Sequence, residues 1–240
     1  MAAENWSQIL NSLHKVAMGE EDISMDLNIA TRGNDTVLLY VRNYQELQVL
    51  HKISDSDSTT VDINEPTQLV FDSQVLRDVV QSAGKQDIDL RFGDHDFDVE
   101  IGQESFDSST EFTLRLVQDT EFQKPLNIDG YERIVDVSRT GLLENLKMFT
   151  SVSKVVDFDI KHEELIISVS DKVQGSGKLV VNIEDAPFKL NATYPIRPLK
   201  DFLQKMKTDQ VSIHMTPSRT IKLESNSGEK VSSIHRSQRL

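Results

Sequence analysis

The sequence contains no cysteine and no long apolar run, and each absence excludes a class of protein. Without cysteine the chain has no disulfides, no thiolate zinc site and no cysteine nucleophile, which is typical of a reducing compartment. No apolar stretch approaches the roughly 20 residues that a membrane-spanning helix needs, and the N-terminus does not resemble a signal peptide. We therefore expect a soluble intracellular protein. Its 240 residues are enough for one large or two ordinary domains.

Motifs for catalysis, nucleotide binding and metal binding are missing as well. The stretch "GSGK" at 175–178 lacks the first glycine and the final Ser or Thr of a phosphate-binding loop, and we interpret it as a tight turn. The six histidines are scattered. Asp94, His95 and Asp96 are adjacent, but they fall at the tip of a predicted hairpin, which favours a solvated turn. We expect no enzymatic activity, no cofactor and no bound metal.

Charge is distributed unevenly along the chain. Residues 1–120 carry 8 basic and 23 acidic side chains, a net charge of −15, whereas residues 121–240 carry 18 and 16, a net charge of +2. The total of −13 argues against a protein that coats nucleic acid with its whole surface. It leaves room for a local basic face, and the alternative is that the acidity only keeps the protein in solution.

One phrase of the sequence occurs twice, half a chain apart. "LRDVVQSAGKQDIDLRF" begins at Leu76 and "LKDFLQKMKTDQVSIHM" begins at Leu199, and their apolar, acidic and amide positions coincide without gaps. A second pair of similar segments lies upstream of the two copies: "ILNSLHKV" (9–16) matches "LLENLKMF" (142–149), and both have the apolar spacing of an amphipathic helix. Two matches in the same order indicate a duplicated structural unit.

Apolar periodicity predicts the same order of elements in each half, which is an α+β fold of helices and antiparallel strands. In the first half we expect helices at about 6–17 and 74–83, and strands at 22–30, 36–43, 47–53, 67–71, 87–92, 97–102 and 111–118. In the second half we expect helices at about 139–149 and 198–207, and strands at 156–160, 165–171, 177–183, 210–215, 220–224 and 231–235. We place the two domains at 1–118 and 134–240.

The segment 119–133 connects the two halves. It contains a proline and a glycine and lacks clear periodicity, yet it carries Phe122, Leu126 and Ile128. A plain linker would be polar, so these apolar residues need partners, either on their own domains or on a bound protein.

Basic side chains concentrate on the predicted helices, although the protein is acidic. If the four helices share one layer, its outer face would be locally cationic and would meet phosphates without reading bases. The alternative is that these are lysines whose stems lie along amphipathic helices. The candidate DNA-contacting residues are Lys15, Arg77, Lys85, Arg139, Lys147, Lys200, Lys205 and Lys207.

With these features the chain resembles the sliding clamps of the proliferating cell nuclear antigen family, as a divergent archaeal or viral member. The resemblance rests on "NATYPIRPLKDFLQKMKTDQVSIHM", "SRTGLLENLKMFTSVSKVVDFDI" and "FDSQVLRDVVQSAGKQDIDLRF", and on their order. It covers most of the chain, although residues 31–65 align weakly. It implies a DNA-clamp fold of two similar domains, each with two helices on antiparallel sheet, joined by an interdomain connecting loop.

The family resemblance also implies a function and its sites. Family members close three subunits head to tail into a ring that encircles duplex DNA and tethers polymerases and other enzymes. The expected partners are duplex DNA, a DNA polymerase, a clamp loader and other enzymes. The resemblance places subunit-interface strands at Thr113, Arg115, Val117, Leu179, Val180 and Val181. It places the groove for short apolar and aromatic partner motifs at Leu47, Val49, Leu126, Ile128 and Ile234. The expected location is intracellular and DNA-associated.

Two departures from the family pattern keep alternatives open. The C-terminus reads "SSIHRSQRL" instead of an apolar residue followed by Ala-Pro and a basic residue, and the N-terminus "MAAENW" does not enter a strand directly. A checkpoint-type subunit of a heteromeric ring would fit both departures. A monomeric processivity factor and an interaction module without a DNA role are the rivals from other classes.

Overall fold

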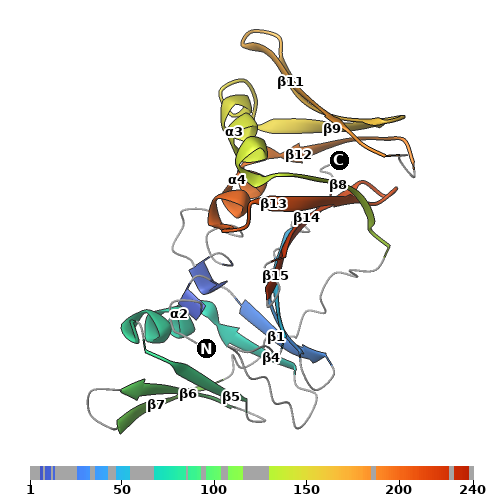
Figure 1. The fold of residues 1–240 in the computed structure, drawn as a ribbon. Coiled ribbons are helices and arrows are strands. Elements are labelled where there is room, and N and C mark those ends of the chain that lie inside the picture. Colours follow the sequence, from blue (N-terminus) through green and yellow to red (C-terminus); the bar gives the residue numbers. More distant parts are fainter. Residues whose placement is uncertain are drawn as a thin grey trace. The chain divides into compact units, whose positions relative to one another are not determined.

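The computed structural model describes residues 6–7, 9–11, 13, 26–32, 36–42, 47–54, 68–84, 86–92, 96–103, 108–115, 130–184, 188–226 and 230–237. These residues form an α+β protein of mostly antiparallel strands with few helices, as predicted (Figure 1). The chain divides into two compact units, which we describe separately. The main division lies between Lys124 and Pro125, inside the predicted connector, and Asn43–Val49 also belongs to the second unit.

The first unit contains two antiparallel strand groups and a helix. Their strand orders are β4-β1-β2-β3 and β5-β6-β7, and only the part of β3 from Leu50 onward belongs to this unit. Described residues between 6 and 13 are helical and bury Trp6, Ile9, Leu10 and Leu13. The elements are β1 (Asp26–Arg32), β2 (Thr36–Arg42), β3 (Leu47–Ser54), β4 (Gln68–Asp72), α2 (Ser73–Ser82), β5 (Ile88–Phe92), β6 (Asp96–Gln103) and β7 (Ser108–Arg115).

The second unit has two helices and two strand groups. The strand orders are β11-β10-β9-β12 and β8-β13-β14-β15, and every described pairing is antiparallel. The elements are β8 (Glu132–Ser138), α3 (Arg139–Phe149), β9 (Val155–Lys161), β10 (Glu164–Asp171), β11 (Gly175–Asn182), β12 (Leu190–Pro195), α4 (Ile196–Lys205), β13 (Gln210–Met215), β14 (Thr220–Asn226) and β15 (Lys230–Ser237).

The two units repeat one topology, which explains the repeated phrase of the sequence. Strand order β4-β1-β2-β3 in the first unit corresponds to β12-β9-β10-β11 in the second, and β5-β6-β7 corresponds to β13-β14-β15. Helix α2 follows β4 as α4 follows β12. Equivalent apolar positions, 123 residues apart, are buried in both units: Phe71 and Tyr194, Leu76 and Leu199, and Val80 and Leu203.

Two helices begin where the sequence predicts. Helix α3 spans Arg139–Phe149 as predicted and is capped by Ser138, whose side chain accepts a hydrogen bond from the Gly141 N–H. Helix α2 is capped by Asp72, which accepts from the Gln74 N–H at 2.8 Å. In both cases a polar side chain satisfies an N–H that has no partner within the helix.

The predicted start of the last helix is wrong by two residues. Helix α4 begins at Ile196 and ends at Lys205, so Pro198 lies within its first turn instead of starting it. Proline is tolerated there because the first N–H groups of a helix have no intrahelical acceptor. Met206 is extended and buried, which ends the helix before Lys207.

The predicted tight turn at 175–178 is also wrong, because these residues open strand β11. At Gly177, close packing against a buried aromatic ring requires a glycine. A Cβ atom at this position would lie 2.8 Å from Cε1 of Phe149, so only glycine lets the strand approach that buried ring. The turn itself precedes the strand, where Asp171 accepts from the N–H groups of Val173 and Gln174. Strand β8 was missed, because the adjacent apolar residues Ile134 and Val135 interrupt the alternation of its sequence.

Candidate functional site

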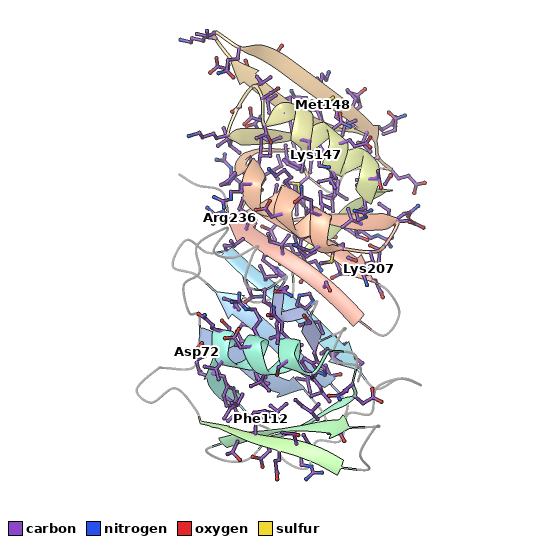
Figure 2. All side chains as sticks on the ribbon, turned by 90° about the vertical axis from the view of Figure 1, so that its left-hand side faces the viewer. Asp72, Phe112, Lys147, Met148, Lys207 and Arg236 are labelled. Atoms are coloured by element: carbon purple, nitrogen blue, oxygen red, sulfur yellow. The ribbon has the colours of Figure 1, made fainter. Side chains whose placement is uncertain are left out.

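Helices α3 and α4 of the second unit carry most of the predicted basic residues that the structure describes. Lys147 and Lys207 are exposed, and Figure 2 shows both beside the two helices. Lys200 and Lys205 are half-buried. Within the described part of the chain, Lys147, Lys200 and Lys207 form no ion pair. Their charges are therefore available to an anionic ligand.

Arg139 differs from these lysines because its guanidinium is occupied within the protein. Nε donates to the carbonyl of Thr208 at 2.8 Å, and Nη1 donates to the carbonyl of Leu203 at 3.1 Å. Its backbone N–H donates to the carbonyl of Asp209 at 2.9 Å. These bonds satisfy carbonyls at and beyond the end of α4, and they join the start of α3 to that end. We assign Arg139 a structural role in addition to the predicted one.

The first unit offers less positive charge on its described helical residues. Arg77 lies on α2 with its side chain largely buried, and its Nε is 3.8 Å from a carboxylate oxygen of Asp78. Lys15 and Lys85 lie outside the described residues. The exposed positions of α2 are Val75, Asp78, Gln81 and Ser82, none of which is basic.

The predicted interface strands both lie at sheet edges. Strand β7 is the outer strand of β5-β6-β7, and β11 is the outer strand of β11-β10-β9-β12. Each carries an exposed apolar side chain, Phe112 (37% exposed) on β7 and Val180 (43% exposed) on β11. The predicted residues Thr113, Arg115, Leu179, Val180 and Val181 lie on these strands, and Val117 lies outside the described residues.

Phe112, Glu111 and Lys178 were not among the predicted interface residues. The charge of Glu111 and Lys178 was visible in the sequence, but their position at open edges depends on the strand order.

The predicted partner groove is described only in part. Leu47, Val49 and Ile234 are in the second unit and are 2%, 0% and 0% exposed, so they form core instead of open surface. Leu126 and Ile128 lie outside the described residues. The structure therefore brings none of the five predicted groove residues to the described surface.

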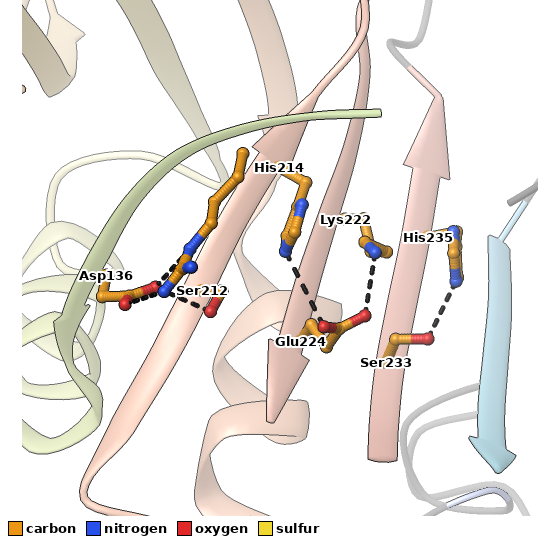
Figure 3. A network of polar contacts seen from close by, with 8 residues as sticks. Asp136, Ser212, His214, Lys222, Glu224, Ser233 and His235 are labelled. Atoms are coloured by element: carbon orange, nitrogen blue, oxygen red, sulfur yellow. Dashed lines mark hydrogen bonds and ion pairs between the residues drawn. The ribbon is translucent and has the colours of Figure 1, made fainter. Parts of the chain in front are cut away.

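A polar network that sequence reasoning missed covers one face of strands β8, β13, β14 and β15 (Figure 3). Lys222, which is 6% exposed, donates to Glu224 at 2.8 Å. Its Nζ also lies 5.5 Å from the ring centroid of Tyr131. His235 is fully buried, with Nε2 2.9 Å from the Ser233 hydroxyl and Nδ1 3.2 Å from the Tyr131 hydroxyl. The sequence signal that could have predicted this polar face is the alternation of polar and apolar residues in 210–215 and 220–224.

A register shift brings Arg133 into this network. Residues three apart on a regular strand point to opposite faces, yet Arg133 donates to Asp136 from Nε at 3.1 Å and also from Nη2. The pairing of β8 with β13 shifts between Ile213 and His214, which adds one residue to β8 and turns Arg133 to the face of Asp136. Ser212 donates to the same carboxylate at 2.7 Å. These bonds lower the pKa of Asp136, the one from Arg133 most.

Burial makes both histidines of the network neutral at pH 7. It lowers the pKa of His235 from 6.5 to about 3 and that of His214 to about 4, with the positive charge of Lys222 acting in the same direction. The contact of His214 with Glu224, at 3.8 Å, is therefore no ion pair at that pH. Burial also raises the pKa of Tyr131 to about 12. The network has the properties of a structural element: most of its polar groups are paired with one another, and Nε2 of His214 is buried without a hydrogen-bond partner among the described residues.

Neither a metal centre nor a transmembrane helix is found among the described residues. No three histidine or acidic side chains gather there in a way that could hold a metal ion. The helices in that part of the chain are too short or too polar to cross a bilayer. No protein-family model matches the chain, and no curated protein matches it either.

Proposed function

We propose that this protein is a DNA sliding clamp, a ring of three subunits that encircles duplex DNA and tethers polymerases and other enzymes to it. The observation that carries this proposal is the repeat: two units of the same topology, with β7 at an edge of one sheet in the first unit and β11 at an edge of one sheet in the second. The DNA-clamp fold predicted from the family resemblance is the finer form of the observed α+β class.

Open edges explain how such a ring would close. Unpaired strand edges favour pairing with another chain. Because the two edges are on different units, pairing β7 of one copy with β11 of the next is heterologous, and it gives a ring when the rotation closes. Five of the six predicted interface residues lie on these two strands, which supports an assembly of several copies over a chain that acts alone.

The lysines of α3 and α4 supply the expected DNA contact. Lys147, Lys200 and Lys207 have no ion-pair partner in the described part of the chain, so they can meet phosphates at little internal cost. Contacts to phosphate carry no sequence information, and weak contacts let a closed ring slide. The acidic first half, at −15, would discourage DNA from binding elsewhere.

Partner binding is proposed at the connector. Leu126 and Ile128 would present apolar side chains to short motifs of a polymerase, a clamp loader or another enzyme. Leu47, Val49 and Ile234 are buried, so in this proposal they support the groove from beneath and do not line it.

The test is the mass of the protein in solution. Size-exclusion chromatography with light scattering should give three times the 27.2-kDa chain at micromolar concentration. A mass of one chain at all concentrations would contradict the homotrimer and favour a monomeric factor or a subunit that needs different partners. Binding to duplexes of unrelated sequence, with equal affinity and strong salt dependence, tests the DNA contact.

A further inference from the structure

A row of three carboxylates crosses the sheet β5-β6-β7 and ends at its open edge. Asp89 is directly opposite Glu100, and Glu100 is directly opposite Glu111. Like charges in directly opposite positions destabilise a strand pair. Arg91 relieves part of this repulsion by donating to Glu100 at 2.7 Å. Glu111 is exposed and forms no ion pair or side-chain hydrogen bond among the described residues, so the edge keeps an uncompensated negative charge.

The open edge in the second unit carries the opposite charge. Lys178 is exposed on β11 and lies opposite Ser168 on β10. Within the part of the chain that the structure describes, it has no ion-pair partner. The opposite face of β11 is apolar, since Gly177 faces the Phe149 ring there. Thus, among the described side chains of the two edges, Glu111 on β7 and Lys178 on β11 are unpaired charges of opposite sign.

We infer that Glu111 of one copy faces Lys178 of a second copy in an antiparallel β7–β11 pairing, and that this pair sets the register of the subunit interface. The inference rests on the proposed head-to-tail ring. With Glu111 opposite Lys178, Phe112 comes opposite Gly177 and Thr113 comes opposite Ser176. Phe112 shares a face with Val99, its buried neighbour on β6, so the apolar face continues across the junction.

Other registers are less favourable. A shift by one residue places the apolar face of one strand against the polar face of the other. A shift by two residues sets Glu111 against Val180 and Lys178 against Thr113, whose hydroxyl already donates to Asp98 at 2.7 Å. That register leaves both Glu111 and Lys178 without an oppositely charged partner across the junction.

The same two charges also act against the wrong assembly. A β7–β7 pairing with Glu111 directly opposite Glu111 would bring two carboxylate rows together, and a β11–β11 pairing with Lys178 directly opposite Lys178 would bring together two lysines. Specificity commonly comes from such repulsion in the unwanted complexes. Against these two-fold pairings the two charges favour the heterologous contact that a ring requires.

Charge reversal tests the pair. Glu111→Lys and Lys178→Glu should each raise the concentration at which trimers form by about tenfold, and the double variant should return it to within about threefold of the wild type. Asp89→Lys is the matched control: it relieves the same carboxylate row from its far end and should leave assembly unchanged. A double variant as weak as the singles would overturn the inference.

Cysteine crosslinking tests the register directly, because the natural chain has no cysteine. Oxidation of the Glu111→Cys, Lys178→Cys variant should give covalent dimers and trimers, since directly opposite Cβ atoms are close enough for a disulfide. The Thr113→Cys, Lys178→Cys variant should give few. More crosslinking in the Thr113→Cys, Lys178→Cys variant than in the Glu111→Cys, Lys178→Cys variant would overturn the register. If the wild type is still a trimer, that result does not contradict the proposed clamp. A monomeric wild type would remove both.

Discussion

Removing the imidazole of His235 should make the stability of the protein less sensitive to acid. His235 is fully buried on β15 and is held between the hydroxyls of Ser233 and Tyr131. Its burial lowers its pKa from 6.5 to about 3. In the folded protein it therefore stays neutral at pH 5, whereas in the unfolded chain it takes up a proton below about pH 6.5.

The sign and size of the effect follow from this difference. A depressed folded pKa gives stability that is present above pH 6.5 and is lost as the pH falls toward 3. The difference in proton binding contributes about 0.2 kcal/mol against stability at pH 7 and about 2 kcal/mol at pH 5. The loss between these pH values is therefore about 2 kcal/mol, and it changes little as long as the folded pKa stays below about 4.

The assay is urea unfolding at pH 7, 6 and 5, followed by circular dichroism, for the wild type and His235→Gln. The glutamine side chain does not titrate in this range, so the free energy of unfolding of the variant should fall by about 2 kcal/mol less than that of the wild type. His162→Asn is the control, because His162 is exposed in a turn at φ 52°, which asparagine tolerates. Equal losses in the wild type and His235→Gln would refute the argument from burial.

Three further predictions concern the second unit. Arg139→Lys keeps the charge but loses the two-armed contact with the carbonyls beyond α4, so thermal unfolding should show a loss of about 1–3 kcal/mol; unchanged stability would contradict its structural role. Gly177→Ala should destabilise by a similar amount, because the new methyl group meets the Phe149 ring; a neutral effect would show that β11 can shift away. Changing the three unpaired lysines Lys147, Lys200 and Lys207 to glutamate should lower the affinity for duplex DNA in an anisotropy titration and leave the mass of the assembly unchanged. The control Lys172→Glu, in the β10–β11 turn, should change neither the affinity nor the mass.

The regular elements could be predicted because each carries a local signal. Helix α3 has a capping serine before its apolar positions, and the described strands that alternate apolar and polar residues were found close to their observed bounds. The repeat was visible because the same core positions recur 123 residues apart, as in Phe71 and Tyr194.

The candidate site was less predictable, because it depends on contacts between distant residues. Arg139 was predicted to meet phosphate from its charge alone, but its hydrogen bonds go to carbonyls more than 60 residues away. The network around Lys222 and His235 requires the strand order, and the place of Arg133 in it requires a register shift that no periodicity reveals. Glu111 and Lys178 could be assigned to an interface only once the strand order showed that β7 and β11 are edge strands.

The most direct test of the clamp is whether the protein forms a topological link with DNA. The protein is incubated with linear DNA, onto which a ring can thread from an end, and the DNA is then ligated into a circle. The assembly is closed with an amine-reactive crosslinker and washed at about 1 M salt, where electrostatic contacts are screened. The proposal predicts that the crosslinked protein stays on the circle and is released when a restriction enzyme cuts the DNA. Loss of the protein from the intact circle in the salt wash, with the crosslinked assembly itself intact, would contradict a ring around the duplex.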